Sequence, residues 1–134
     1  MAEKHFELAD AELEVLKILW EIGPSPVREV LKALHEQGRR VAYTTVQTLL
    51  TRLEQKGYAV SDKSDLAYVY RARVTRNRVT KARLKTLVEQ LYDGAAGPLV
   101  MQLIRDERFT PDEIEQLQSL IERLDADGKR SRKS

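Results

Sequence analysis

The chain offers few side chains that could carry out covalent or metal chemistry. It has no cysteine, which excludes disulfides, thiolate metal sites and cysteine nucleophiles. Its two histidines, His5 and His35, lie in separate segments, and no spacing points to the carboxylates that a zinc ion would need beside them. No phosphate-binding glycine loop, dinucleotide fingerprint or nucleophile elbow occurs. We therefore expect no metal ion, no cofactor and no enzymatic activity.

The chemistry that the sequence does offer is hydrogen bonding from one face of a helix. An apolar stripe at the spacing i, i+3, i+4, i+7 predicts a helix over residues 42–56 whose buried face holds Val46, Leu49, Leu50 and Leu53. At about 100° per residue, the opposite face holds Thr44, Thr48, Thr51 and Gln55, flanked by Thr45, Gln47 and Arg52. Threonine is a mediocre helix former, so four threonines within residues 44–51 need a reason.

Base-pair edges in the major groove of DNA would supply that reason. A threonine hydroxyl donates and accepts hydrogen bonds, its methyl can contact the thymine methyl, and glutamine can pair bidentately with adenine. Tyr43, Arg52 and Lys56 stand at the edges of the same helix, within reach of phosphates. A helix that is rich in threonine without any such role is the other interpretation of these residues.

The distribution of charge is consistent with a phosphate-binding surface. The net charge is only +2, but residues 39–83 hold eleven basic and three acidic side chains, a net +8, against −4 for residues 1–38 and −2 for residues 84–134. A strongly basic middle segment is typical of nucleic-acid-binding proteins, although a solvated face can have the same composition. Arg39 and Arg40, just before the threonine-rich helix, are further candidates for DNA contacts.

Two more helices are predicted before this one. Asp10 is a suitable N-cap for the first, which Gly23-Pro24 ends, and Ser25-Pro26 reads as the N-cap and first residue of a second helix over residues 26–37. Gly38 closes that second helix as the residue beyond its C-cap.

After Gly57 the apolar pattern changes from helical spacing to alternation. Tyr58 and Val60, then Tyr68, Tyr70 and Ala72, predict two strands joined by a polar turn at residues 63–66, and a minimal earlier strand could lie at residues 22–25. Three helices followed by a hairpin are the order of a winged helix-turn-helix, so the predicted fold is mainly α with a small β wing. We expect Lys63 at the wing tip to contact backbone phosphate and no base.

A second region is predicted after residue 74. Helices are expected at residues 75–92 and 99–104, and Thr110-Pro111-Asp112-Glu113 is a capping box that begins another. Residues 125–134 hold almost nothing apolar, which predicts a disordered tail. The apolar side chains of residues 75–124 have no core of their own, so we expect a dimer interface formed by Leu84, Leu87, Val88, Leu91, Leu99, Leu103, Ile114, Leu117, Leu120, Ile121 and Leu124.

Three segments carry a resemblance to a known family. AELEVLKILW (11–20), AYTTVQTLLTRLEQKGY (42–58) and YVYRARV (68–74) resemble the penicillinase repressor family of BlaI/MecI-type regulators, and the similarity extends over about residues 8–124. The resemblance implies a homodimeric repressor whose winged helix binds a palindromic operator and whose C-terminal helices form the dimer. It implies that the helix over residues 42–56 is the recognition helix, the helix that enters the major groove, and it assigns to this helix the side chains of Thr44, Thr45, Gln47, Thr48 and Arg52.

The chain departs from the family pattern in two places. In antibiotic-responsive members, a membrane sensor protease triggers cleavage at an Asn-Phe pair within a short apolar helix, and the matching place here is Gln102-Leu103. Copper-responsive relatives carry a cysteine-rich C-terminal motif, which a chain without cysteine cannot have. The operator, the regulated genes and the signal that relieves repression are left open.

Two further expectations concern partner and location. A winged-helix module that binds another protein, without sequence-specific DNA binding, is the alternative to a repressor. No apolar run approaches the roughly 18 residues of a membrane span, and the first ten residues contain no secretory signal, so a cytoplasmic protein is expected.

Overall fold

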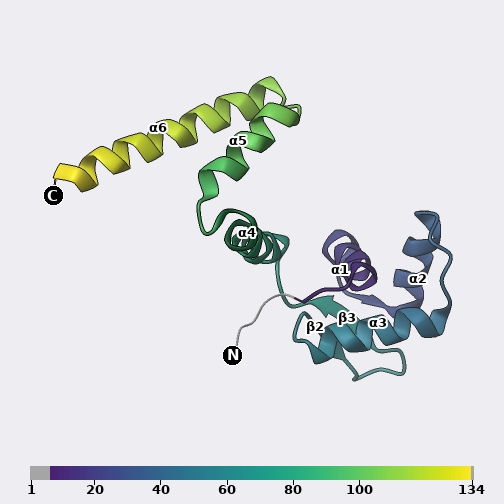
Figure 1. Ribbon diagram of the computed structural model, residues 1–134. Helices are drawn as coiled ribbons and strands as arrows, with labels where there is room; N and C mark the ends of the chain where they lie inside the picture. The colour runs from purple at the N-terminus through teal and green to yellow at the C-terminus, as the bar shows by residue number, and fades with distance from the viewer. Residues whose placement is uncertain (1–6, 134) are drawn as a thin grey trace. The chain divides into compact units, whose positions relative to one another are not determined.

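The computed structural model of the chain describes residues 7–133. Two residues named in the sequence analysis lie outside the described residues: His5, one of the two histidines, and Ser134, the last residue of the predicted disordered tail. The chain forms two compact units, of which the first ends at Leu91 and the second begins at Tyr92 (Figure 1).

Up to Ala72, the first unit has three helices and three strands in the order of a winged helix (Figure 1). The elements are α1 (Asp10–Ile22), β1 (Ser25–Pro26), α2 (Val27–Glu36), α3 (Tyr43–Gln55), β2 (Ala59–Asp62) and β3 (Val69–Ala72). The sheet has three antiparallel strands in the order β1-β3-β2, and Tyr70 of β3 pairs with both Ser25 of β1 and Ser61 of β2. This architecture confirms the predicted fold class.

Glycines end both helices of the helix-turn-helix. Gly38 follows α2 with a φ of 84°, and Gly57 follows α3 with a φ of 86°, a left-handed conformation that favours glycine. After each glycine the next N–H turns back to the helix: Arg39 N donates to the Leu34 carbonyl and Tyr58 N to the Leu53 carbonyl. These two Schellman motifs fix where α2 stops and where the wing begins.

The core of the first unit lies where α1, α2 and α3 meet the sheet. The predicted apolar stripe of α3 is confirmed, because Val46, Leu49, Leu50 and Leu53 are all buried. Close packing of this side of α3 leaves its opposite side to solvent. The other buried apolar side chains are Leu8, Val15, Leu16, Ile18, Leu19, Val27, Val30, Leu34, Tyr58, Ala59, Tyr70 and Val79.

Two predicted helix starts were wrong in detail. Asp10 is the first residue of α1 and not its cap, because Ala9 takes the N-cap position and donates its N–H to the Glu12 carboxylate at 3.0 Å. Pro26 is the N-cap of α2 and part of β1, while the Ser25 hydroxyl donates to the Gly23 carbonyl instead of capping the helix. The early strand therefore lies at residues 25–26 and not at residues 22–25, because Ile22 still belongs to α1.

Helix α4 spans Arg76–Tyr92, and the hydroxyl of the preceding Thr75 accepts the Arg78 N–H. Most of α4 belongs to the first compact unit, so the division between units lies further along the chain than the boundary predicted after residue 74. The physical reason is that Val79 is buried in the winged-helix core and that the Trp20 indole donates to the Val74 carbonyl at 2.8 Å.

The second unit contains α5 (Ala96–Asp106) and α6 (Pro111–Lys133). The predicted capping box is confirmed: Glu113 N donates to the Thr110 hydroxyl at 3.1 Å, and Thr110 N donates to the Glu113 carboxylate at 2.9 Å. Helix α6 continues to Lys133 where the sequence predicts disorder, and an ion pair between Asp125 and Lys129 at spacing i, i+4 supports its last turns. Among the described residues, no helix combines the length and apolar character that crossing a membrane requires.

Candidate nucleic-acid interface

The solvent-facing side of α3 carries mainly uncharged hydrogen-bonding side chains. The residues predicted to face DNA from this helix are all exposed: Tyr43, Thr44, Thr45, Gln47, Thr48, Thr51, Arg52 and Lys56. Because the opposite face of α3 is packed in the core, these side chains project from a well-anchored helix. Whether they contact DNA stays a prediction.

The threonine hydroxyls on this face are already directed by the helix. Thr48 Oγ1 donates to the Thr44 carbonyl and Thr51 Oγ1 donates to the Gln47 carbonyl, each at 2.9 Å. A hydroxyl has one proton and two lone pairs, so each oxygen can still accept hydrogen bonds after its proton is donated. Within a DNA groove such an oxygen suits the amino group of adenine or cytosine.

A groove of about 400 Å³ lies between the start of α2, the exposed side of α3 and the wing. Arg28 stands at its α2 edge, and Tyr43 and Gln47 line it from α3. The sequence did not indicate Arg28 or Tyr68 as site residues. A signal was available for Arg28, because it lies in the first turn of the helix before the recognition helix, and in helix-turn-helix proteins that first helix crosses the DNA backbone. The lining residues are Pro26, Val27, Arg28, Tyr43, Gln47, Leu66, Ala67, Tyr68 and Tyr70.

The wing is tied to the end of α3 through Glu54. The Ser61 hydroxyl donates to Glu54 Oε2 at 2.6 Å, and Lys63 Nζ lies 3.9 Å from the same oxygen. Lys63 also lies 5.6 Å from the centre of the Tyr68 ring, and its side chain remains more than half exposed. The wing therefore presents one cation beside an exposed aromatic ring.

Hydrogen bonds also order the residues at the base and tip of the wing. Asp62 Oδ1 accepts the Ser64 N–H at 3.0 Å, and this hydrogen bond lowers the pKa of the exposed Asp62 carboxyl. At the base, Tyr70 is buried under α3 and is hydrogen-bonded to Thr51. Burial raises the pKa of the Tyr70 phenol, which keeps it neutral beside the recognition helix.

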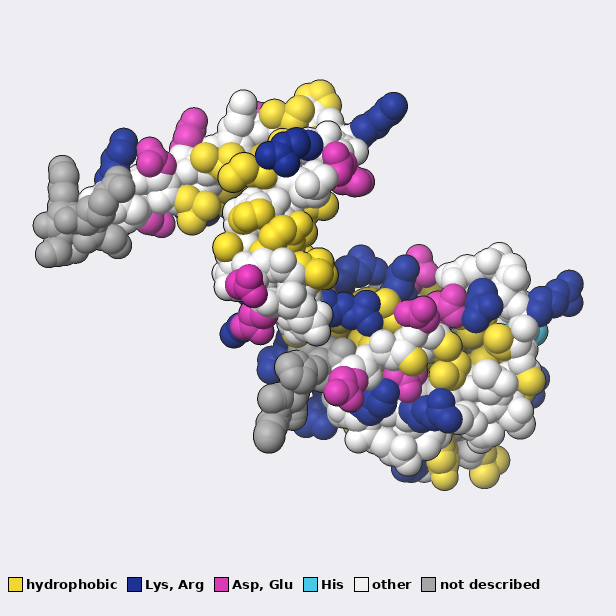
Figure 2. Space-filling model, viewed as in Figure 1, with side chains coloured by type: hydrophobic (Ala, Val, Ile, Leu, Met, Phe, Trp, Pro, Cys, Tyr) yellow, Lys and Arg dark blue, Asp and Glu magenta, His cyan; other side chains and the backbone are white. Residues whose placement is uncertain are grey.

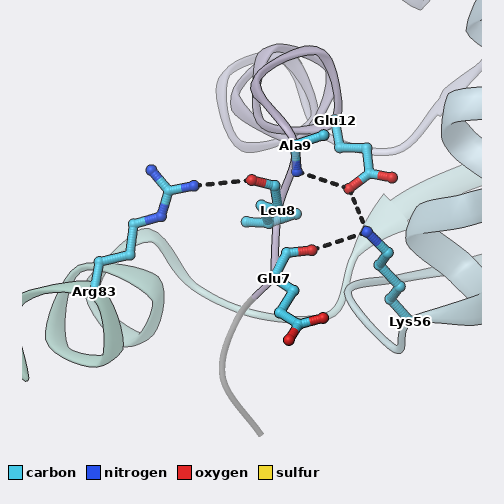
Figure 3. Close-up of polar contacts among 6 residues, drawn as sticks. All are labelled: Glu7, Leu8, Ala9, Glu12, Lys56 and Arg83. Atoms are coloured by element: carbon cyan, nitrogen blue, oxygen red, sulfur yellow. Dashed lines mark hydrogen bonds and ion pairs between the residues drawn. The ribbon is translucent and has the colours of Figure 1, made fainter. Parts of the chain in front are cut away.

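Besides Lys63, two more of the predicted phosphate-binding cations have partners inside the chain. Arg39 Nε donates to Glu14 Oε1 at 3.1 Å, which ties the turn before α3 to α1. Lys56 Nζ donates to Glu12 Oε1 at 2.7 Å and to the Glu7 carbonyl at 2.8 Å (Figure 3). Arg40 and Arg52 are exposed. No three His, Asp or Glu side chains in the described part of the chain lie close enough together to hold a metal ion.

The carboxylate of Glu12 is buried, with a residue exposure of 2 %. Burial alone would raise its pKa, but the hydrogen bonds from Lys56 and from the Ala9 N–H, together with the charges of Lys56 and Arg52, outweigh burial and hold the pKa below its usual range. Glu12 therefore stays ionised and joins the start of α1 to the end of α3.

We expect Glu12→Gln to lower the free energy of unfolding at pH 7 by about 2 kcal/mol, because a hydrogen bond to a buried charge is lost. A lowered folded-state pKa means that this stabilisation is present above the unfolded-state pKa of about 4.3 and disappears as the pH falls through the folded-state value. Urea unfolding at pH 7 and below pH 4 measures both effects. Glu21→Gln, at an exposed position of the same helix, is the control and should differ little from wild type at either pH.

Comparison with known proteins places the chain in a family. The family model described as penicillinase repressor matches residues 8–123. The chain belongs to the penicillinase repressor family. The penicillinase repressor of Staphylococcus aureus is 28 % identical over 121 residues, which are 90 % of this chain and 95 % of that protein. The methicillin resistance regulatory protein MecI of Mammaliicoccus sciuri is 27 % identical over 121 residues, 90 % of this chain and 98 % of that protein.

A solved structure described as the DNA binding domain of the repressor BlaI is 32 % identical, covers 56 % of this chain and 90 % of that chain, and superposes with a TM-score of 0.48. The predicted family resemblance is confirmed by the family match, which spans both compact units of this penicillinase repressor family member.

Exposed apolar side chains mark the second unit (Figure 2). The candidates predicted for a dimer interface are half-buried at Val88, Leu99 and Leu117, and exposed at the others. Sequence reasoning missed Val100, Met101 and Ile104, which are also exposed on α5 and extend the apolar surface round this helix. The exposed candidates are Leu84, Leu87, Leu91, Leu103, Ile114, Leu120, Ile121 and Leu124.

The residues at the place of the family's cleaved bond lie inside a helix. Gln102 and Leu103 fall within α5, and the Gln102 amide donates to the Asp106 carboxylate one turn later. A protease binds its substrate as an extended chain, so cleavage between these residues requires α5 to open locally.

Proposed function

We propose that this protein is a transcriptional repressor that places α3 in the major groove of a palindromic operator. The observation that carries the proposal is the exposed face of α3, in which Thr44, Thr48 and Gln47 present hydrogen-bonding groups from a helix whose other face is buried. Family membership supports the same function, because relatives bear the names penicillinase repressor and methicillin resistance regulatory protein. Its place of action is then the cytoplasm, and its action is binding rather than catalysis.

Phosphate contacts in the proposal come from cations on α2, on the wing and next to α3. Arg28 lines the groove from α2, and Lys63 lies on the wing, 5.6 Å from the centre of the Tyr68 ring. Arg40 and Arg52 are exposed next to α3. These cations position the domain on the duplex without reading its sequence. Arg39 and Lys56 are secondary candidates, since each donates a hydrogen bond to a carboxylate within the chain, at 3.1 and 2.7 Å, whereas Lys63 lies 3.9 Å from Glu54.

The proposal includes a homodimer formed through the C-terminal helices. Exposed apolar side chains follow α5 and α6, such as Met101, Ile121 and Leu124, and a second copy of the chain would cover them. A two-fold dimer then reads two half-sites of an inverted repeat. A sensor protease that relieves repression at Gln102-Leu103 would act on α5 in its opened state.

Sequencing of DNA captured by the purified protein from fragmented genomic DNA tests the proposal. We expect enrichment of an inverted repeat, with half-sites about one helical turn, or a multiple of it, apart. A winged-helix module that binds another protein predicts captured DNA with no common sequence. That result would overturn the repressor function and favour the alternative.

Thr48→Val should weaken discrimination between the captured operator and a variant changed at the base pair that Thr48 faces. Valine keeps the shape and the methyl of threonine but loses the accepting oxygen, so we expect a loss of about 1–3 kcal/mol of discrimination. Competition gel shifts with the two operators measure it. Thr80→Val, at an exposed position of α4, should leave discrimination unchanged; equal discrimination by wild type and Thr48→Val would remove Thr48 from the proposed base contacts.

A further inference from the structure

Helix α4 is held to the winged helix by few contacts. Val79 is its one buried side chain. At its start, the Trp20 indole donates to the Val74 carbonyl at 2.8 Å, and the Arg76 guanidinium lies 5.4 Å from the centre of the Trp20 ring. Two turns later, Arg83 Nη2 donates to the Leu8 carbonyl at 3.2 Å.

These contacts attach α4 at two separate points along α1. Trp20 lies near the end of α1, whereas Leu8 lies just before its start, and at a rise of about 1.5 Å per residue the two are roughly 18 Å apart. Because Val74 precedes Arg83 in the chain, α4 runs antiparallel to α1. One attachment would leave the helix free to swing, but two attachments fix its direction.

The Arg83 contact falls on the segment that also receives the end of the recognition helix. Lys56, the C-cap of α3, donates to the carbonyl of Glu7, and Arg83 donates to the carbonyl of the adjacent Leu8 (Figure 3). The segment itself is well anchored, since the Leu8 side chain is buried and Ala9 N donates to Glu12. Neighbouring peptide groups thus join the end of α3 to α4.

We propose that Arg83 is a positioning residue for DNA binding, which fixes the direction of α4 relative to the recognition helix through the Leu8 carbonyl. Helix α4 itself carries Leu84, Leu87 and Leu91, which are exposed and are among the predicted dimer-interface residues, so its direction sets how the two recognition helices of a dimer are spaced. Arg83 thereby limits the half-site separation that the repressor accepts. This inference rests on the proposed function.

Operators with altered spacing test the consequence for DNA. Each base pair inserted between half-sites moves one of them by about 3.4 Å and rotates it by about 34°. The DNA must deform to accommodate that change, and we expect the wild-type complex to lose about tenfold or more in affinity. We expect Arg83→Gln to reduce this spacing penalty to about threefold or less. Lys85→Gln, which removes an exposed positive charge from the same helix, should keep the wild-type penalty.

A purely structural role of Arg83 would lower the affinity for every spacing by the same factor and leave the penalty unchanged, which would overturn the inference. Wild-type protein that binds its operator without any spacing preference would also overturn it. Trp20→Phe removes the other hydrogen bond but keeps an aromatic ring, so it should relax the penalty in the same direction and decides the matter if Arg83→Gln does not fold.

A distance measurement tests the direction of α4 without DNA. The chain has no cysteine, so Gln37→Cys and Glu89→Cys place spin labels on the exposed ends of α2 and α4 alone. With labelled protein diluted into unlabelled protein, we expect a narrow distance distribution that Arg83→Gln broadens and Lys85→Gln leaves narrow. An unchanged distribution in Arg83→Gln would overturn the inference. Failure of wild-type protein to bind any DNA would instead overturn the proposed function, while the distance measurement still decides the role of Arg83.

Discussion

Raising the salt concentration from about 50 to about 200 mM should weaken operator binding about ten-thousandfold. Protein cations displace counterions condensed on DNA, and affinity falls with a slope of about −0.9 per phosphate neutralised. Four phosphate contacts per protomer, supplied by Arg28, Arg40, Arg52 and Lys63, give about eight per dimer and the stated factor. Filter binding across a salt series measures the slope.

The same titration separates the candidate cations. Arg52→Gln removes one proposed contact from each protomer, so the magnitude of the slope should fall by about two per dimer. Lys85→Gln makes the same change of charge outside the proposed surface and should leave the slope as in wild type. A salt-independent affinity, or an equal slope for all three proteins, would contradict phosphate binding by this face.

Local sequence signals predict the recognition helix and its surroundings well. The stripe from Val46 to Leu53 determines which side of α3 is buried, and Gly38 and Gly57 take left-handed conformations that few other residues adopt readily. The capping box at Thr110 works in the same way, because both of its hydrogen bonds lie within four residues. Signals of this kind depend on neighbouring residues and need no knowledge of the tertiary structure.

Contacts between distant segments account for what the sequence does not predict. The sequence indicates that Lys56 is an unpaired cation at the edge of α3, but its ammonium donates a hydrogen bond to the carboxylate of Glu12, which is far from it in the chain. Arg28 reaches the edge of the groove only because α2 and the wing fold against α3. The attachment of α4 through Val79 and Arg83 likewise depends on the position of α1, so a boundary drawn from composition alone falls too early.

A chain that ends at Leu91 should be monomeric and should bind the full operator at least a hundredfold more weakly than the intact protein. The first compact unit keeps its whole core, including Val79, so we expect it to fold. In the intact dimer, binding of one winged helix holds the second near its half-site, and this effective concentration contributes about 10²–10⁴ in affinity. Sedimentation equilibrium and gel shifts measure the two effects.

Comparison with a single half-site shows whether the loss comes from dimerisation. The shortened chain should bind an isolated half-site as tightly as one winged helix of the intact protein does, because α3 is unchanged. In the intact chain, replacing both Leu120 and Leu124 by Glu should reproduce the loss, whereas Gln118→Glu adds a charge at an exposed position of the same helix and should not. A shortened chain that remains dimeric would place the interface on α4, where Leu84, Leu87 and Leu91 stay exposed, and would assign the apolar surface of α5 and α6 to another partner.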